Sequence, residues 1–217
     1  TNAGPIGRHS MIELTREVCD ADGDLDLSED RFMLALSLAL KLDPREVGHL
    51  VYDTPFKGFN RVIKRIEKDG KITVIADKYE GKRFNSPNDL VYKSNGDLYF
   101  TDPPYGLPLR EKDPGKELDW FGVYRLAKDG KVTLLTQEMT RPNGIAFAPD
   151  EKTLYVANSH GPRPHIFAMN LNADGAASAP KTFFDTKGLS GPGGADGMKV
   201  DAAGNLWATG PGGLMII

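Results

Sequence analysis

The sequence has a single cysteine, Cys19, so no disulfide can form within the chain. No apolar run approaches the roughly 18 residues that a membrane-spanning helix needs, and the first residues lack the basic-then-apolar order of a signal peptide. The net charge is −3 and no basic cluster stands out, which disfavours nucleic acid and anionic membranes as partners. These absences predict a soluble protein. They leave open the cytoplasm and, after removal of a signal peptide, the periplasm or the exterior of the cell.

Glycine and proline, by contrast, are frequent, with 24 and 15 residues, which favours a turn-rich β protein over a helical bundle. Three segments share one pattern: Arg61–Asp102, Gly122–Ser159 and His165–Gly210. Each has a short apolar strand, a turn ending in Gly, a loop closed by a tetrad (SPND, RPNG or GADG), and two apolar strands joined by a polar turn. The first two segments carry a further strand directly after the first turn.

Four short strands in a repeat of this length are typical of a β-propeller blade. A blade is a small twisted sheet with two apolar faces, which only neighbouring blades can cover. We therefore predict an all-β fold, a β-propeller with about three blades over residues 59–217. A β-sandwich or an open array of hairpins is the alternative, and the tetrads that recur in register favour the propeller.

The third residue of each tetrad is the main candidate for a functional site. These residues are Asn88, Asn143 and Asp196, and they lie 55 and 53 positions apart, about one blade each. Rotation about a propeller axis relates equivalent positions, so we expect all three side chains to meet at the central channel. Two amides and one carboxylate are hard oxygen donors that suit Ca²⁺ better than zinc. The alternative is that each residue only caps its own turn.

Six phrases of the sequence resemble the SMP-30/gluconolactonase/regucalcin family of six-bladed propeller lactonases, and its bacterial gluconolactonase branch in particular. The resemblance covers roughly residues 59–217, and the phrases read NSPNDLVY, LYFTDPPYGL, ELDWFGVYRL, RPNGIAF, TLYVANS and ADGMKVDAAGNLW. The resemblance implies one divalent cation, usually calcium, with Asn143 and Asp196 as ligands and Asn88 in contact with metal or substrate. It also implies that Asp196 is the catalytic proton donor and acceptor.

The resemblance also implies a substrate-binding region around the first tetrad. Asp102 and Tyr105 fall in a loop that would line the channel mouth, although a proline-rigid turn without ligand contact is the alternative. Ser86 stands where animal members carry an arginine that reaches the substrate, so a contact from Ser86 would be weaker and uncharged. A glutamate ligand that the family supplies from an Glu-Gly-Pro phrase near its N-terminus has no counterpart here, since residues 1–5 read TNAGP.

The function implied is calcium-dependent hydrolysis of a sugar lactone, a small-molecule substrate. Two alternatives stay open. The absent glutamate favours a calcium-binding or interaction module without turnover, and the same metal centre would also suit an esterase or phosphotriesterase.

Residues 1–58 do not follow the repeat. The stretch Asp20–Asp30 resembles a degenerate EF-hand calcium loop with alternating aspartates, but it lacks the required Gly and the final acid, so a solvated acidic turn is the alternative. The Ala- and Leu-rich stretch Arg31–Leu42 favours a helix, although its alternating leucines also fit a strand. We predict a short helical N-terminal segment.

The repeat covers too little of the chain for a closed ring. Six blades need about 270 to 300 residues at this repeat length. We therefore expect a fragment, a rearranged sequence, or a protein that completes its sheet with a partner, and we expect open strand edges to allow self-association.

Overall fold

The computed structural model describes residues 61–160 and 164–217. The helical segment and the acidic loop predicted within residues 1–58 lie outside these ranges. In the described part, strands account for nearly all regular structure, and the exception is the short 3₁₀ helix η3 (Arg110–Lys112). None of the helices described is long and apolar enough to cross a membrane.

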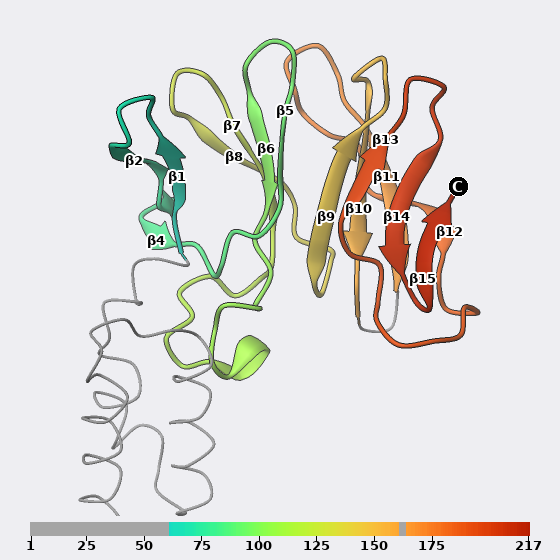
Figure 1. Cartoon of the computed structure of the whole chain (residues 1–217). Helices are drawn as coiled ribbons and strands as arrows, with labels where there is room; N and C mark the ends of the chain where they lie inside the picture. The colour runs from blue at the N-terminus through green and yellow to red at the C-terminus, as the bar shows by residue number, and fades with distance from the viewer. Residues whose placement is uncertain (1–60, 161–163) are drawn as a thin grey trace, which may run out of the picture.

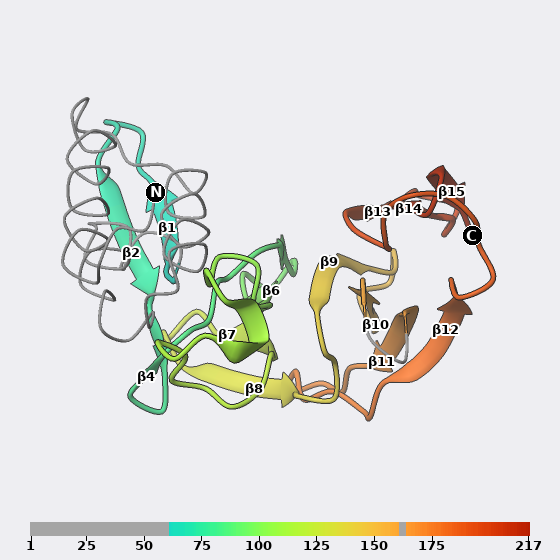
Figure 2. The ribbon, with the colours of Figure 1, turned by 90° about the horizontal axis from the view of Figure 1, so that it is seen from below.

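The strands form a row of antiparallel sheets that follow one another around an open arc (Figures 1 and 2). The first contains β1 (Ile63–Ile66) and β2 (Ile72–Ala76), followed by the small hairpin of β3 (Lys78–Tyr79) and β4 (Lys82–Arg83). The second contains β5 (Leu90–Tyr92), β6 (Leu98–Thr101), β7 (Val123–Leu126) and β8 (Val132–Thr136). The third contains β9 (Pro142–Phe147), β10 (Thr153–Asn158), β11 (His165–Asn170) and β12 (Lys181–Asp185). The fourth contains β13 (Met198–Val200), β14 (Leu206–Gly210) and β15 (Gly213–Ile216).

This arrangement confirms the all-β propeller prediction but corrects the phase of the repeat. Each segment of the sequence pattern begins with the outer strands of one sheet and ends with the inner strands of the next. The segment Gly122–Ser159, for example, contributes β7 and β8 to the second sheet and β9 and β10 to the third. The pattern was also incomplete in its last copy, because β12 pairs with β11 as the outermost strand of the third sheet.

The turns between outer strands explain why the pattern recurs. In the KDG turn after β1, Gly70 has a φ of +83°, a conformation that residues with a side chain rarely adopt. The Asp69 carboxylate accepts a hydrogen bond from the Lys71 amide at 3.0 Å and closes the turn. The KDG turn after β7 repeats both features at Asp129 and Gly130. The same three letters therefore make the same hairpin in successive sheets.

The cores lie between the sheets and not within a single one. On β6, Leu98 and Phe100 pack toward the β1–β2 sheet, whereas Tyr99 packs toward the β9–β12 sheet. All three are nearly fully buried, because successive side chains of a strand point to opposite faces. A third cluster, around Ala157 and Met198, joins the β9–β12 and β13–β15 sheets. Each sheet is thus held by its neighbours, as a propeller requires.

Candidate functional site

One pocket collects residues from three successive sheets at the ends of their inner strands. It has a volume of about 280 Å³ and is lined by Asn88, Tyr105, Asn143 and Asp196, among others. Asn88 comes just before β5, Asn143 is the second residue of β9, and Asp196 comes just before β13. The structure therefore brings together the three tetrad residues and Tyr105. The roles predicted for them, as metal ligands, proton donor and acceptor, and substrate contacts, stay predictions.

Hydrogen bonds connect the pocket residues from one sheet to the next. The Asn88 Nδ2 donates to Asn143 Oδ1 at 2.5 Å. The Asn143 Nδ2 donates to Ser159 Oγ at 2.9 Å and, more weakly, to Tyr105 Oη at 3.4 Å. The Ser159 hydroxyl in turn donates to the backbone carbonyl of Ala195, next to Asp196. Because Ser159 accepts a hydrogen bond from the side-chain nitrogen of Asn143, the side-chain oxygen of Asn143 is directed toward Asn88.

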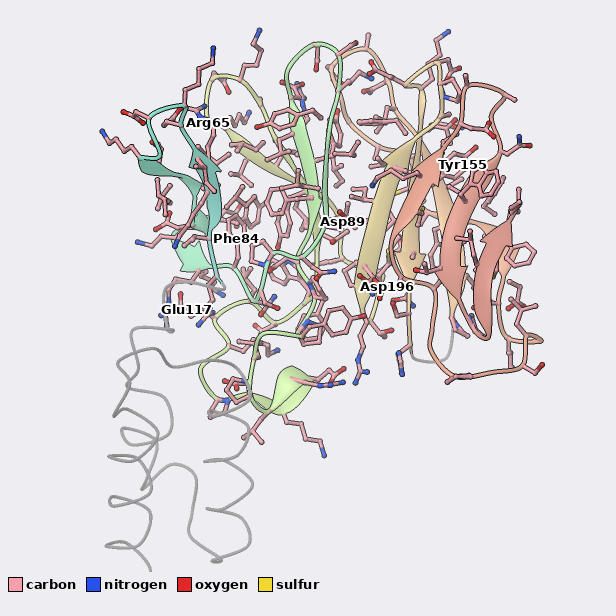
Figure 3. All side chains as sticks on the ribbon, in the orientation of Figure 1. Arg65, Phe84, Asp89, Glu117, Tyr155 and Asp196 are labelled. Carbon is pink, nitrogen blue, oxygen red and sulfur yellow. The ribbon has the colours of Figure 1, made fainter. Side chains whose placement is uncertain are left out.

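The backbones under the pocket are tied together as well. The Asp89 carboxylate, just before β5, accepts a hydrogen bond from the Ile145 backbone amide of β9 at 3.0 Å, which links the second sheet to the third. The Thr101 hydroxyl donates a hydrogen bond to the backbone carbonyl oxygen of Asn143 at 2.8 Å. On the other side, β9 approaches the third tetrad so closely that a Cβ added at Gly144 would lie 2.0 Å from the Asp196 carbonyl oxygen. Figure 3 labels Asp89, which lies between the second and third sheets, and Asp196, which lies between the third and fourth. Asp89 and Gly144, the last residues of SPND and RPNG, therefore lie where neighbouring sheets meet.

Ser86 and Asp102, two further predicted substrate contacts, do not line this pocket. Asp102 is fully buried, and its carboxylate accepts hydrogen bonds from the Ser86 amide at 2.7 Å and the Asn85 amide at 2.8 Å. Burial raises the pKa of Asp102 to about 7, and these hydrogen bonds oppose the rise. The Ser86 hydroxyl donates to Pro103 and accepts from the Gly106 amide. In the structure both residues hold the loop that carries Tyr105, and their contact with substrate stays a prediction.

Asn158 repeats the contact of Asp102 one sheet later. Its Oδ1 accepts a hydrogen bond from the Arg141 amide at 2.8 Å, just as Asp102 accepts one from Ser86. Arg141 and Ser86 are therefore equivalent positions, each two residues before the asparagine of its tetrad.

Five lining residues were not singled out from the sequence: Arg110, Arg141, Ser159, His160 and Gly194. Arg141 and Ser159 lie inside the phrases RPNG and TLYVANS, and the repeat is a usable signal for Arg141, which stands two residues before a tetrad asparagine as Ser86 does. Arg110 and His160 are exposed at the surface, and no spacing in the sequence marks them.

The donor chemistry of the pocket fits a hard cation such as Ca²⁺. Asn88, Asn143 and Asp196 carry amide and carboxylate oxygens, and Ca²⁺ takes six to eight oxygen ligands. In this structure Asn143 Oδ1 accepts a hydrogen bond from Asn88 Nδ2, so a cation bound to this oxygen would replace that hydrogen bond. The remaining places would fall to water or substrate. Within residues 61–160 and 164–217, no group of three or more His, Cys, Asp or Glu side chains could hold a metal ion, so any cation here must depend on neutral oxygens and one carboxylate.

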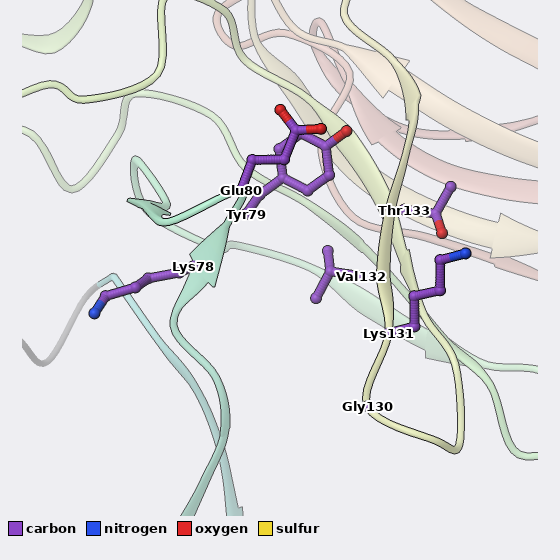
Figure 4. Close-up of a pocket in the computed structure, with 7 residues that line it drawn as sticks. All are labelled: Lys78, Tyr79, Glu80, Gly130, Lys131, Val132 and Thr133. Atoms are coloured by element: carbon purple, nitrogen blue, oxygen red, sulfur yellow. The ribbon is translucent and has the colours of Figure 1, made fainter.

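A second cavity of about 400 Å³ lies between the β3–β4 hairpin and β8 (Figure 4). Its lining includes Lys78, Glu80 and Lys131 but none of the predicted site residues. It shows no convergence of side chains from different sheets comparable to the first pocket.

Known proteins resemble this chain over the propeller. A gluconolactonase of Zymomonas mobilis is 44% identical over 151 residues, which is 66% of this chain and 42% of that protein. The lactonohydrolase oryL of Aspergillus oryzae is 32% identical over 108 residues, which is 45% of this chain and 24% of that protein. The solved structure of a gluconolactonase from Xanthomonas campestris has a TM-score of 0.63 and 36% identity, and the match covers 73% of this chain and 52% of that one.

The chain thus spans about half the length, or less, of the relatives it matches. The structure of a luciferin-regenerating enzyme shares the fold, with a TM-score of 0.58 at 23% identity. The family model for the SMP-30/gluconolactonase/LRE-like region matches residues 46–217, most of the sequence. On this match, and on the fold and sequence identities above, the chain belongs to the SMP-30/gluconolactonase/LRE-like family.

Proposed function

We propose that this chain hydrolyses a sugar lactone in a calcium-dependent reaction at the pocket of Asn88, Asn143 and Asp196. The observation that carries the proposal is that these three residues, which belong to three successive sheets, line one cavity. The names of the relatives, gluconolactonase and lactonohydrolase, support the choice of a lactone as substrate.

Asp196 is the carboxylate positioned to move protons. It is exposed to solvent within the pocket, where a water molecule can reach it. We assign it the role of general base, which takes a proton from the water that attacks the lactone carbonyl carbon. The bond between that carbon and the ring oxygen then breaks, and Asp196 returns the proton to the ring oxygen. The product is a hydroxy acid, which ionises and releases one proton to solvent.

The other pocket residues would bind and orient. Asn88, Asn143 and Asp196 would hold the cation, which supplies Lewis-acid polarisation of the lactone carbonyl. Asn88 is also exposed, so its amide is accessible to substrate hydroxyls. Tyr105 packs at the edge of the same pocket, with its hydroxyl near the Asn143 amide. Burial raises the pKa of Tyr105, which keeps its phenol protonated and able to donate to a substrate oxygen.

Acid release measured by pH-stat tests this proposal. The wild-type protein should open an aldonolactone faster than the buffer does, with a rate that saturates as calcium is added and disappears with a chelator. Asp196→Ala should lose the calcium-dependent rate, because no other carboxylate lines the pocket in the described residues. Asp119→Ala removes a carboxylate that is 87% exposed and outside the pocket, and it should behave as wild type. Calcium-dependent hydrolysis that survives in Asp196→Ala would refute the assignment.

A calcium-binding module without turnover is the second candidate. The single carboxylate in the described pocket favours it, since a cation held mainly by neutral oxygens is bound weakly. Calorimetric calcium binding without acid release from lactones would identify this case.

A further inference from the structure

Three equivalent positions precede the tetrad residues of the pocket, and one of them carries a positively charged side chain. Ser86, Arg141 and Gly194 each stand two residues before a tetrad residue of the pocket. The Ser86 hydroxyl is used in bonds to Pro103 and Gly106. A Cβ at Gly194 would lie 2.4 Å from the Ser159 carbonyl oxygen, so this position has no room for a side chain. Arg141 is left as the position from which a long side chain enters the pocket.

Arg141 is held at its backbone amide and at its guanidinium group. Its backbone amide donates to Asn158 Oδ1 at 2.8 Å, which fixes the start of the side chain. Its Nε donates to the Glu111 carboxylate of η3, in the loop that leads from β6 to β7. Only 17% of the side chain is exposed, against 40% for Glu111. The hydrogen bond from Arg141 lowers the pKa of Glu111, so the Glu111 carboxylate stays ionised at neutral pH.

This fixed guanidinium suits an anion formed in the pocket. With Nε engaged by Glu111, the two terminal amino groups are the part of Arg141 left to meet a ligand. Arginine presents its N–H groups in a planar fork that matches a carboxylate, and such bidentate pairs are among the stronger hydrogen bonds in proteins. A lactone is neutral, whereas its hydrolysis product carries a carboxylate at the former carbonyl carbon. The negative charge therefore develops during the reaction.

We infer that Arg141 contacts the substrate and binds the carboxylate that ring opening creates, with Glu111 as its positioning residue. This inference rests on the proposed lactone hydrolysis. Arg141 would stabilise the charge as it grows on the carbonyl oxygen and would discriminate charged from uncharged sugar derivatives. An interaction made only as charge develops should appear mainly in kcat.

The test compares two ligands at one fixed calcium concentration. D-gluconate carries the carboxylate, and D-glucitol has the same chain of hydroxyl groups without it. By calorimetry, the wild-type protein should bind gluconate more tightly than glucitol. Arg141→Gln should weaken gluconate binding roughly 10- to 100-fold and leave glucitol binding unchanged, Arg141→Lys should recover part of the loss, and Glu111→Gln should give an intermediate loss. Arg65→Gln removes an arginine that is also paired with a glutamate but is outside this pocket, and it should match wild type.

The outcomes separate this inference from the function beneath it. If wild type binds gluconate no better than glucitol, or if Arg141→Gln binds gluconate as wild type does, the role of Arg141 is refuted, even when lactones are hydrolysed. If gluconate binding depends on Arg141 but no lactone is opened, the anion site stands and the proposed hydrolysis fails. In an active protein, Arg141→Gln should lower kcat for a neutral lactone with little change in KM, and the opposite pattern would also refute the role.

Discussion

Gly144 tests whether the close approach of two sheets builds the pocket. It follows Asn143 on β9, and a Cβ at this position would lie 2.0 Å from the Asp196 carbonyl oxygen and 2.9 Å from its carbonyl carbon. Both neighbours are backbone atoms, so no side-chain rotation can relieve the contact. Gly144→Ala must therefore move β9 and the Asp196 loop apart.

The size of this movement follows from the distances. An ordinary contact begins at 3.4 Å, so the carbonyl oxygen must retreat by about 1.4 Å from its place 2.0 Å from the added carbon. A misplacement of about 1 Å in a catalytic site can cost about 100-fold in rate. Overpacking of this kind also destabilises a protein by about 1–3 kcal/mol. We expect Gly144→Ala to lose about 100-fold in kcat/KM for lactone, with weaker calcium binding and a lower melting temperature.

Gly197 provides the matched control. It directly follows Asp196, and a Cβ there would meet no atom within 4 Å. Gly197→Ala should keep activity, calcium affinity and melting temperature close to wild type. The assays are lactone opening by pH-stat, calcium titration by calorimetry and thermal unfolding. Equal calcium affinity and equal stability in Gly144→Ala and Gly197→Ala would show that the approach of β9 to Asp196 does not form the site.

Three further predictions concern the framework. Removing the Asp89 carboxylate with Asp89→Ala leaves the Ile145 amide without its partner across the sheets, so the free energy of unfolding by urea should fall by about 1–3 kcal/mol, and an unchanged value would contradict the link. Burial raises the pKa of Asp102 from its ordinary 3.8 to about 7, so the stabilisation from this group is complete below pH 3.8 and declines as the pH rises through 7. Wild type should therefore lose more unfolding free energy between pH 5 and pH 8 than Asp102→Asn, and equal losses would contradict the raised pKa. Ile66 and Ile72 are 74% and 55% exposed on the β1–β2 sheet. If the wild-type protein self-associates, replacing both with lysine should lower the molar mass measured by light scattering. A molar mass equal to that of the wild type would place the contact elsewhere.

The propeller could be predicted because its local signals are repeated. Inner strands such as β6 are buried on both faces and therefore read as short apolar runs. The KDG turns mark the outer hairpins through glycines with positive φ. The phase of the repeat could not be predicted in this way, because the same order of strands along the chain fits either grouping, and only hydrogen-bond pairing decides between them. The strand β12 was missed because its residues are mostly exposed and lack an alternating pattern.

The candidate site was predicted in part for a similar reason. Asn88, Asn143 and Asp196 occupy one register position, so symmetry alone brings them to one place. The equivalent positions 86, 141 and 194 obey the same symmetry, but their side chains differ in what they can reach. Whether a serine is used up by its loop, or a glycine is required by a nearby carbonyl, depends on contacts between distant segments. The sequence shows the position, and only packing shows that Arg141 enters the pocket.

The most direct test of the central claim is a crystal structure of the protein grown with a lanthanide in place of calcium. Anomalous difference density should show one ion in the pocket, in contact with side-chain oxygens of Asn88, Asn143 and Asp196 at about the 2.3–2.6 Å typical of calcium ligands. Well-ordered side chains with no ion between them at saturating metal, or ions bound separately near each residue, would contradict the account.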